Sequence, residues 1–194
     1  FLDSDEMNVT GGVVPENVIL TDFRDLEGYA ITEPCVSMML YSLGKNPEVS
    51  NVVFESCCEA SKDIGVLRLA DFLSGFSFSF KSAFAKHPGR VLTRAEGGCS
   101  LSVPGLIDRL FQISGADAEQ RAIYNAEREN AVAISAEFDR IQFVRGKDFL
   151  SVLSYYLNEA FEFCQSLLSM HLVHSIDSYR NQPRFSRIEG FLRQ

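Results

Sequence analysis

Apolar residues recur at strand and helix spacings along the first half of the chain. Residues 17–21 (NVILT) form a short run rich in β-branched side chains, which is typical of a buried strand. Residues 35–43 are mostly apolar and lie between Pro34 and Gly44. A helix is expected there, because proline is favoured in the first helical turn and glycine after the last. Residues 52–73 carry apolar side chains near a period of 3.6, which predicts a long helix.

Strict alternation predicts two further strands. In FSFSF, residues 76–80, the phenylalanines would share one face of a strand and the serines the other. In DRIQFVRG, residues 139–146, apolar and polar positions also alternate, so a strand is predicted there as well. Residues 95–105 are rich in glycine and serine and contain a proline, so we place the boundary between two lobes in this linker.

Helical spacing dominates the second half of the chain. Residues 106–113 predict a short helix, and residues 117–134 predict a longer polar helix with a solvated face. Residues 147–176 predict one long helix or two. The pattern therefore indicates an α/β core over residues 1–94, joined to a mainly helical lobe over residues 106–194.

Composition is typical of a globular protein with a sizeable core. The chain is 46% hydrophobic and 23% charged, and its five cysteines include no CxxC pair. An odd number of scattered cysteines indicates reduced, mostly buried thiols in a cytoplasmic protein, rather than a disulfide framework or a zinc site. No apolar run reaches the ~18 residues that a membrane span needs, so no membrane partner is expected.

The net charge of −8 is concentrated near the N-terminal end. Residues 1–33 contain eight acids and one base, Arg24, so this segment carries −7. Both a solvated acidic face and a cluster neutralised by divalent cations fit this distribution. Phosphates are bound mainly by lysine and arginine, so an acidic chain is expected to approach nucleic acid only with help from Mg²⁺ or from a basic partner.

Asp3 and Asp5 are candidate metal ligands. Two aspartates separated by one residue point to the same side of a strand, and at its carboxyl end that side faces the ligand crevice of an α/β sheet. Close carboxylates suit Mg²⁺ or Mn²⁺, although such pairs also serve as loop caps. Glu27 follows the 17–21 strand and would approach the pair, so that two metal ions could support attack on a phosphate. A helix cap or an ion pair with Arg24 explains Glu27 equally well.

These segments resemble Toprim domains of the branch related to OLD nucleases. In that branch a strand ends in DxD, and a later strand runs into R-x-x-E-x-Y-L/I; here FLDSDE and NVILTDFRDLEGYAI match. DIGVLRLADFLSGFSFSFK (63–81) is similar to the iG-x-l-R-…-l-x-F-k segment, and FVRGKDFLSVL (143–153) to the G-[KH]-D-[LF] segment. The whole pattern most resembles the Toprim effector subunit of PARIS-type anti-phage systems, which works beside an ABC-type ATPase.

The resemblance implies a parallel Toprim sheet and a Mg²⁺-dependent nuclease that is toxic in a defence response. Asp3, Asp5 and Glu27 would hold one or two Mg²⁺ or Mn²⁺ ions. Lys147 matches a lysine that stabilises transition-state charge. The substrate would be DNA, or RNA such as tRNA, and the ABC-type ATPase would be the partner. We expect activity to be gated by that partner or by self-association as a homodimer.

Toprim sites also need a glutamate on a strand that precedes the DxD strand. No such strand is found ahead of Asp3, so we expect this chain to be a piece of a longer protein that would not cleave by itself. A rival hypothesis is a non-catalytic interaction subunit that docks on the partner ATPase through its acidic patch. Primase-like or topoisomerase-like strand chemistry on the same Toprim site is a third alternative.

Overall fold

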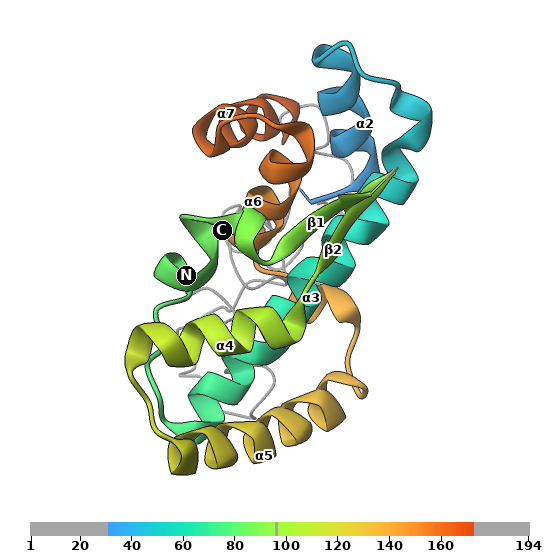
Figure 1. The fold of residues 1–194 in the computed structure, drawn as a ribbon. Coiled ribbons are helices and arrows are strands. Elements are labelled where there is room, and N and C mark those ends of the chain that lie inside the picture. Colours follow the sequence, from blue (N-terminus) through green and yellow to red (C-terminus); the bar gives the residue numbers. More distant parts are fainter. Residues whose placement is uncertain (1–30, 96, 173–194) are drawn as a thin grey trace, which may run out of the picture.

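The computed structural model describes residues 31–95 and 97–172. In this part of the chain, helices surround one long central helix, and a small antiparallel sheet lies beside it (Figure 1). The predicted ligands Asp3, Asp5 and Glu27 lie outside the described residues, and so does the predicted strand 17–21. The described fold is therefore mixed but mostly helical, and the parallel Toprim sheet stays a prediction.

The elements follow one another with short connections. In chain order they are α2 (Glu33–Ser42), η2 (Pro47–Val49), α3 (Ser50–Ser74), η3 (Lys81–Ala85), η4 (Pro88–Arg90), β1 (Leu92–Ala95), β2 (Gly98–Leu101), α4 (Val103–Ser114), α5 (Ala118–Ser135), η5 (Arg140–Phe143), α6 (Gly146–Leu157) and α7 (Phe161–Leu172). None of the helices described here is both long and apolar enough to cross a membrane.

Local chemistry sets the ends of α2 and α3. The Thr32 hydroxyl accepts a hydrogen bond from the Cys35 N–H at 3.4 Å, and Pro34 occupies the first turn. After α2, Gly44 has φ +64°, and after α3, Gly75 has φ +70°. Glycine adopts this left-handed conformation without steric cost. Both helices predicted in this part of the sequence are confirmed.

Helix α3 is the axis of the described fold. It packs against α2, α5, α6, η5 and the β1–β2 hairpin. Its buried residues lie on several sides of the helix, as expected for a helix covered on most faces. Gly65 allows the closest approach, because a Cβ at this position would lie 1.9 Å from the carbonyl oxygen of Phe143. The segment before α6 is therefore seated directly on α3.

The strand prediction for residues 76–80 is wrong. The segment is irregular, although the phenylalanines do pack inward while the serines are exposed. A strand needs a neighbouring strand to pair with its backbone. Here the Asp71 carboxylate accepts the Phe78 N–H at 3.1 Å instead. The ring centres of Phe78 and Phe111 lie 5.1 Å apart. The alternation therefore indicates which side chains pack on the core, and not that the segment pairs in a sheet.

The strand prediction for residues 139–146 is also wrong. Residues 140–143 form the 3₁₀-helix η5. The Asp139 carboxylate accepts a hydrogen bond from the Ile141 N–H at 3.1 Å, and this starts a turn. Phe143 is buried and Ile141 is half-buried, so the alternating side chains pack on the core without a strand partner.

The predicted linker, residues 95–105, contains strand β2 and the first turn of α4. Strand β1 pairs antiparallel with β2, with Leu92 opposite Leu101. One cluster of buried hydrophobic residues includes side chains from before and after this segment. The division into a core and a helical lobe stays a prediction, because the expected parallel sheet lies outside the described residues.

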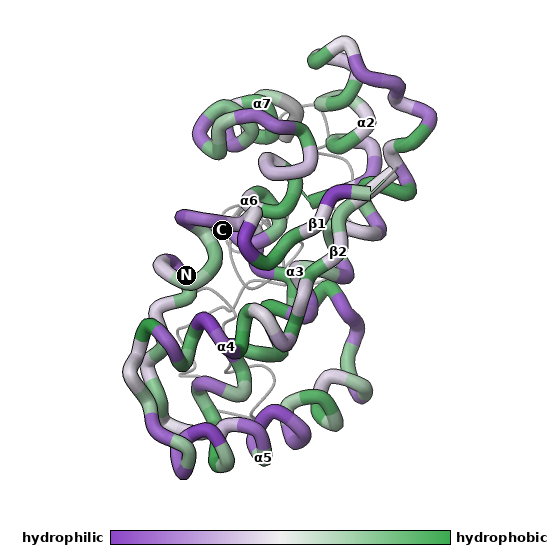
Figure 2. Tube along the Cα trace, viewed as in Figure 1, coloured by the Kyte–Doolittle hydropathy of each residue, from purple (hydrophilic) through white to green (hydrophobic). Residues whose placement is uncertain are grey.

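The helices predicted in the second half are confirmed. The region from residue 147 onward divides into α6 and α7, separated near Asn158, which has φ +62°. In α5, hydrophilic and hydrophobic positions alternate along an exposed helix (Figure 2). Its anchor is Tyr124, which is fully buried and donates its hydroxyl hydrogen to the Leu67 carbonyl at 2.9 Å. The polar helix is therefore held to α3 by an aromatic side chain.

All five cysteines are buried and form no disulfide, as the sequence predicts. Burial raises the pKa of Cys58 to about 12 and the pKa values of Cys99 and Cys164 to about 11. These thiols are therefore protonated at neutral pH, and they act as small apolar side chains of the core.

Candidate functional site

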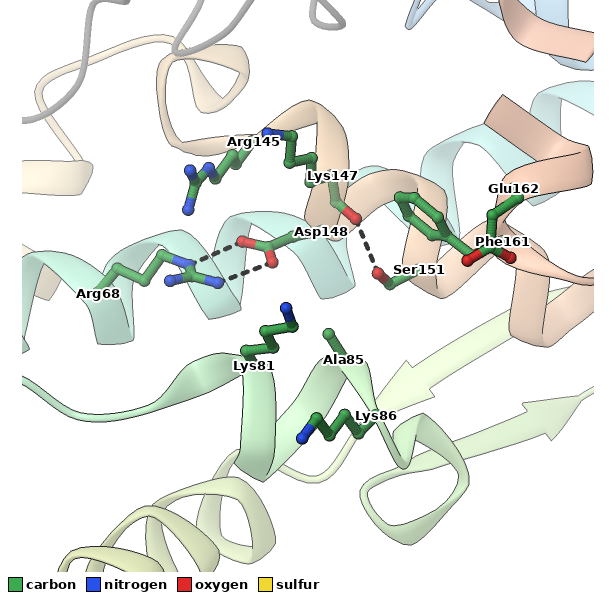
Figure 3. A pocket seen from close by; sticks show the side chains of 10 residues that line it. All are labelled: Arg68, Lys81, Ala85, Lys86, Arg145, Lys147, Asp148, Ser151, Phe161 and Glu162. Atoms are coloured by element: carbon green, nitrogen blue, oxygen red, sulfur yellow. Dashed lines mark hydrogen bonds and ion pairs between the residues drawn. The ribbon is translucent and has the colours of Figure 1, made fainter. Parts of the chain in front are cut away.

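A pocket of about 570 Å³ lies where α3, η3, α6 and the start of α7 meet (Figure 3). Its lining contains five cationic side chains and two acidic ones, which is a net charge of +3 in a chain of net charge −8. The lining residues are Arg68, Lys81, Ala85, Lys86, Arg145, Lys147, Asp148, Ser151, Phe161 and Glu162. Three of the five lysines in the whole sequence are in this list, so positive charge is concentrated here.

Arg68 and Asp148 form a two-pronged ion pair on the floor of the pocket. Arg68 Nε donates to Asp148 Oδ2 at 2.8 Å, and Arg68 Nη2 donates to Oδ1 at 2.9 Å. The Asp148 side chain is only 4% exposed and that of Arg68 is 18% exposed. The guanidinium carbon also lies 4.3 Å from the centre of the Phe80 ring. A buried carboxylate needs such compensation, and here the arginine neutralises it.

In the first turn of α6, the neighbouring residues Lys147 and Asp148 differ in their exposure to solvent. Asp148 points inward to α3, whereas Lys147 is exposed at the pocket. An acidic residue in the first turn is favoured by the positive end of the helix dipole. The Ser151 hydroxyl donates to the Lys147 carbonyl at 2.8 Å, which adds a side-chain bond to this turn. The Lys147 side chain is thus presented from a well-anchored helix end.

The opposite side of the pocket comes from η3, a five-residue π-helix that carries Lys81. Lys86 follows directly after it. Ala83 and Phe84 are the buried residues of η3. Arg109 Nε of α4 donates a hydrogen bond to the Ala83 carbonyl at 2.9 Å. Figure 3 shows Lys81 extending from η3 toward the Arg68–Asp148 pair, with Lys86 on the edge below it.

The structure describes one of the four predicted site residues. Lys147 lines the pocket, and its predicted role on the transition-state charge stays a prediction. Asp3, Asp5 and Glu27 lie outside the described residues, so their predicted metal binding is untested. Within the residues described, no group of three or more histidine, cysteine, aspartate or glutamate side chains could hold a metal ion.

Sequence reasoning missed most of the pocket. The two motif segments did contain the signal, because Arg68 and Lys81 occupy the charged positions of one pattern, and Lys147 and Asp148 those of the other. No spacing rule connects Arg68 with Asp148 across 80 residues of sequence. Lys86 lies outside both patterns. The charged positions of the motifs therefore identify the pocket only once the chain is folded.

The chemistry of the pocket rests on its own residues. No family model, curated protein or solved structure matches this chain. The resemblance to OLD-related Toprim nucleases therefore stays a prediction from short motifs. A concave site with several exposed ammonium groups is suited to phosphate or carboxylate ligands, which accept charge-assisted hydrogen bonds from lysine and arginine.

Proposed function

We propose that the chain is part of a Mg²⁺-dependent nuclease that cleaves DNA, or RNA such as tRNA, as the toxic effector of a bacterial anti-phage system. The observation that supports this proposal is the meeting of two motif segments in one cationic pocket. Arg68 and Lys81 come from the first segment, and Lys147 comes from the second. In an acidic protein, lysines gathered in a pocket favour a phosphate-bearing substrate.

Lys147 would act on the charge that develops during cleavage. Hydrolysis of a phosphodiester increases negative charge on the nonbridging oxygens, and a positioned ammonium group stabilises that charge. Lys147 is exposed in the first turn of α6, where the helix dipole adds positive potential. Bound Mg²⁺ would supply Lewis-acid stabilisation of the same phosphate. Its proposed ligands are Asp3, Asp5 and Glu27.

The proposal also covers the fold around the metal ligands, the compartment and the partner of the nuclease. The metal ligands would lie on a parallel Toprim sheet, and the protein would work in the cytoplasm beside an ABC-type ATPase. Activity would be gated by that ATPase or by formation of a homodimer. Gating agrees with the acidic character of the chain. Electrostatic repulsion between the protein and nucleic acid would limit cleavage until a partner or a metal ion compensates the charge.

The test is a cleavage assay with the full-length protein. Mixed tRNA and plasmid DNA are incubated with Mg²⁺ or EDTA, using the wild type, Asp3→Ala, Lys147→Ala and the control Lys45→Ala. We expect Mg²⁺-dependent cleavage that Asp3→Ala abolishes. Lys147→Ala should lower the rate on the order of 10²- to 10³-fold, as loss of one transition-state donor does. Lys45 is exposed and outside the pocket, so its variant should cleave normally.

The same assay separates the nuclease from the rival docking subunit. If neither pool is cut, the assay is repeated with the partner ATPase and a phage trigger. Absence of metal-dependent cleavage under those conditions would overturn the proposal. Loss of ATPase binding in Asp3→Ala would then favour an acidic docking surface. If the protein is a nuclease, the Asp3→Ala variant should still bind the ATPase but should no longer cleave nucleic acid.

A further inference from the structure

The pocket contains more positive charge than one catalytic lysine requires. Besides Lys147, its lining includes Arg68, Lys81, Lys86 and Arg145, and the proposed reaction gives none of these a role. We infer that Lys81 and Lys86, beside the Arg68–Asp148 pair, form a binding site for a second phosphate group of the substrate strand, next to the one that is cleaved. This inference rests on the proposed nuclease function, and it adds a substrate-positioning site to it.

The π-helix is the first observation that points to such a site. The Lys86 N–H donates to the Lys81 carbonyl at 3.0 Å, which is the i→i+5 hydrogen bond of a π-turn. In an α-helix, residues five apart would point about 140° away from each other, because each residue turns the helix by about 100°. The wider turn rotates Lys86 back toward the side of the helix that carries Lys81, and both residues line the pocket. A rare backbone geometry thus lets two lysines of one short segment line the same pocket.

The Arg68–Asp148 pair is the second observation. Both Asp148 oxygens are engaged by Arg68, so this carboxylate is already neutralised on the pocket floor. Glu162 is then the remaining acidic side chain of the lining. Four cationic side chains of the lining, from Lys81, Lys86, Arg145 and Lys147, outnumber this one carboxylate, so the field inside the pocket is positive. Arg68 is also held by the Phe80 ring, which makes it a rigid neighbour for an anion.

The size of the pocket favours a phosphate that is part of a larger unit. A space of about 570 Å³ is within the range of about 300 to 1,000 Å³ that holds small organic ligands. A sugar–phosphate unit would use this volume, with the half-buried Phe161 as an apolar wall. The same chemistry would recognise the phosphate of a free nucleotide, so the experiment has to distinguish the two sources.

The experiment measures binding without cleavage. The full-length protein is titrated into a fluorescein-labelled single-stranded oligonucleotide in EDTA, and anisotropy is recorded over a series of salt concentrations. The pocket variant is Lys81→Ala with Lys86→Ala. The matched control is Lys45→Ala with Lys62→Ala, which removes the same charge from the two lysines that do not line the pocket. Lys81→Arg with Lys86→Arg keeps the charge and tests whether charge restores binding.

We expect the pocket variant to bind more weakly and with a shallower salt dependence. Each lost contact to a single strand lowers the slope of log K against log salt by about 0.7, so two contacts lower it by about 1.4 and weaken binding roughly 25-fold at about 0.1 M salt. The control and the arginine variant should bind like the wild type. Equal affinity of the pocket variant and the control variant, or no binding by the wild type, would overturn the inference.

Competition with inorganic phosphate and adenosine monophosphate identifies the source of the phosphate. If the pocket variant loses binding of the mononucleotide but not of the oligonucleotide, the site serves a free nucleotide and the inference is overturned. The nuclease proposal fails separately. Pocket-dependent binding without Mg²⁺-dependent cleavage would contradict the proposed function alone, whereas cleavage with unchanged binding in the pocket variant would contradict this inference alone.

Discussion

Two arginine–carboxylate groups connect α3 to the segment that runs from residue 139 into α6, and they differ in burial. Arg68 and Asp148 form the pair on the pocket floor, with side chains 18% and 4% exposed. Arg140 binds Glu55 and Glu59 about three turns earlier on α3, and there the side chains are 35%, 41% and 55% exposed. Both groups join α3 to this segment through arginine and carboxylate side chains, and they differ most in their exposure to solvent.

The difference teaches what each group contributes. Water screens the exposed group, and exposed ion pairs contribute about 0 to 1 kcal/mol to folding. The buried pair is different, because removal of one partner leaves an uncompensated charge and costs about 3 to 5 kcal/mol. The buried pair also lines the pocket, whereas the exposed group does not. The buried pair is thus the one that both holds α3 to α6 and lines the candidate site.

The largest effect is expected from Asp148→Ala. The variant leaves the Arg68 guanidinium without its carboxylate, so the free energy of unfolding should fall by about 3 to 5 kcal/mol. Denaturant unfolding measures this change. As a control, Arg68→Met combined with Asp148→Leu removes both charges and should recover much of the loss. A decrease below about 1 kcal/mol in the single variant would mean that water already solvates the pair.

An intermediate effect is expected from Gly65→Ala, which disturbs the α3 surface between the two groups. Alanine favours a helix over glycine by about 1 kcal/mol. The added Cβ, however, would lie 1.9 Å from the Phe143 carbonyl oxygen, so η5 has to move away from α3. We expect a net loss of roughly 2 kcal/mol in the free energy of unfolding. Gly65→Ser should lose more, and equal stability of the wild type and both variants would show that η5 is not seated on α3.

The smallest effect is expected from Arg140→Ala. The loss should be below about 1 kcal/mol and should shrink as salt is added. The hydrogen bond from Arg140 lowers the pKa of Glu55 below its ordinary value of 4.5. A lowered carboxyl pKa stabilises the fold above that ordinary value, and the contribution is lost as the pH falls through the lowered pKa. Unfolding at neutral and at acidic pH should therefore show a difference between wild type and variant only at neutral pH.

Short-range chemistry made several elements predictable. Pro34 and Gly44 bracket α2, and apolar positions near a 3.6-residue period over residues 52–73 identify α3. Further buried positions lie between them, because neighbouring elements cover most faces of this helix. The alternation in residues 76–80 correctly indicates which side chains pack inward. It does not indicate a strand, because the same alternation arises when an irregular segment lies along a core.

The candidate site was predictable only in part. Lys147 follows from the resemblance of one motif segment, and the structure places it at the pocket. The placement of Lys81 and Lys86 along the pocket involves the π-helix η3, and no local pattern predicts a π-helix here. The predicted ligands Asp3, Asp5 and Glu27 stay predictions.

By itself the sequence determines the helices, the reduced and buried cysteines and the uneven distribution of charge. Each of these depends on residues near one another in the chain or on composition alone. The tertiary structure decides that Arg68 meets Asp148 and that three lysines of an acidic protein surround one pocket. The physical reason is distance along the chain. Contacts between residues 80 positions apart depend on how α3, η3 and α6 pack, and packing is a property of the whole fold.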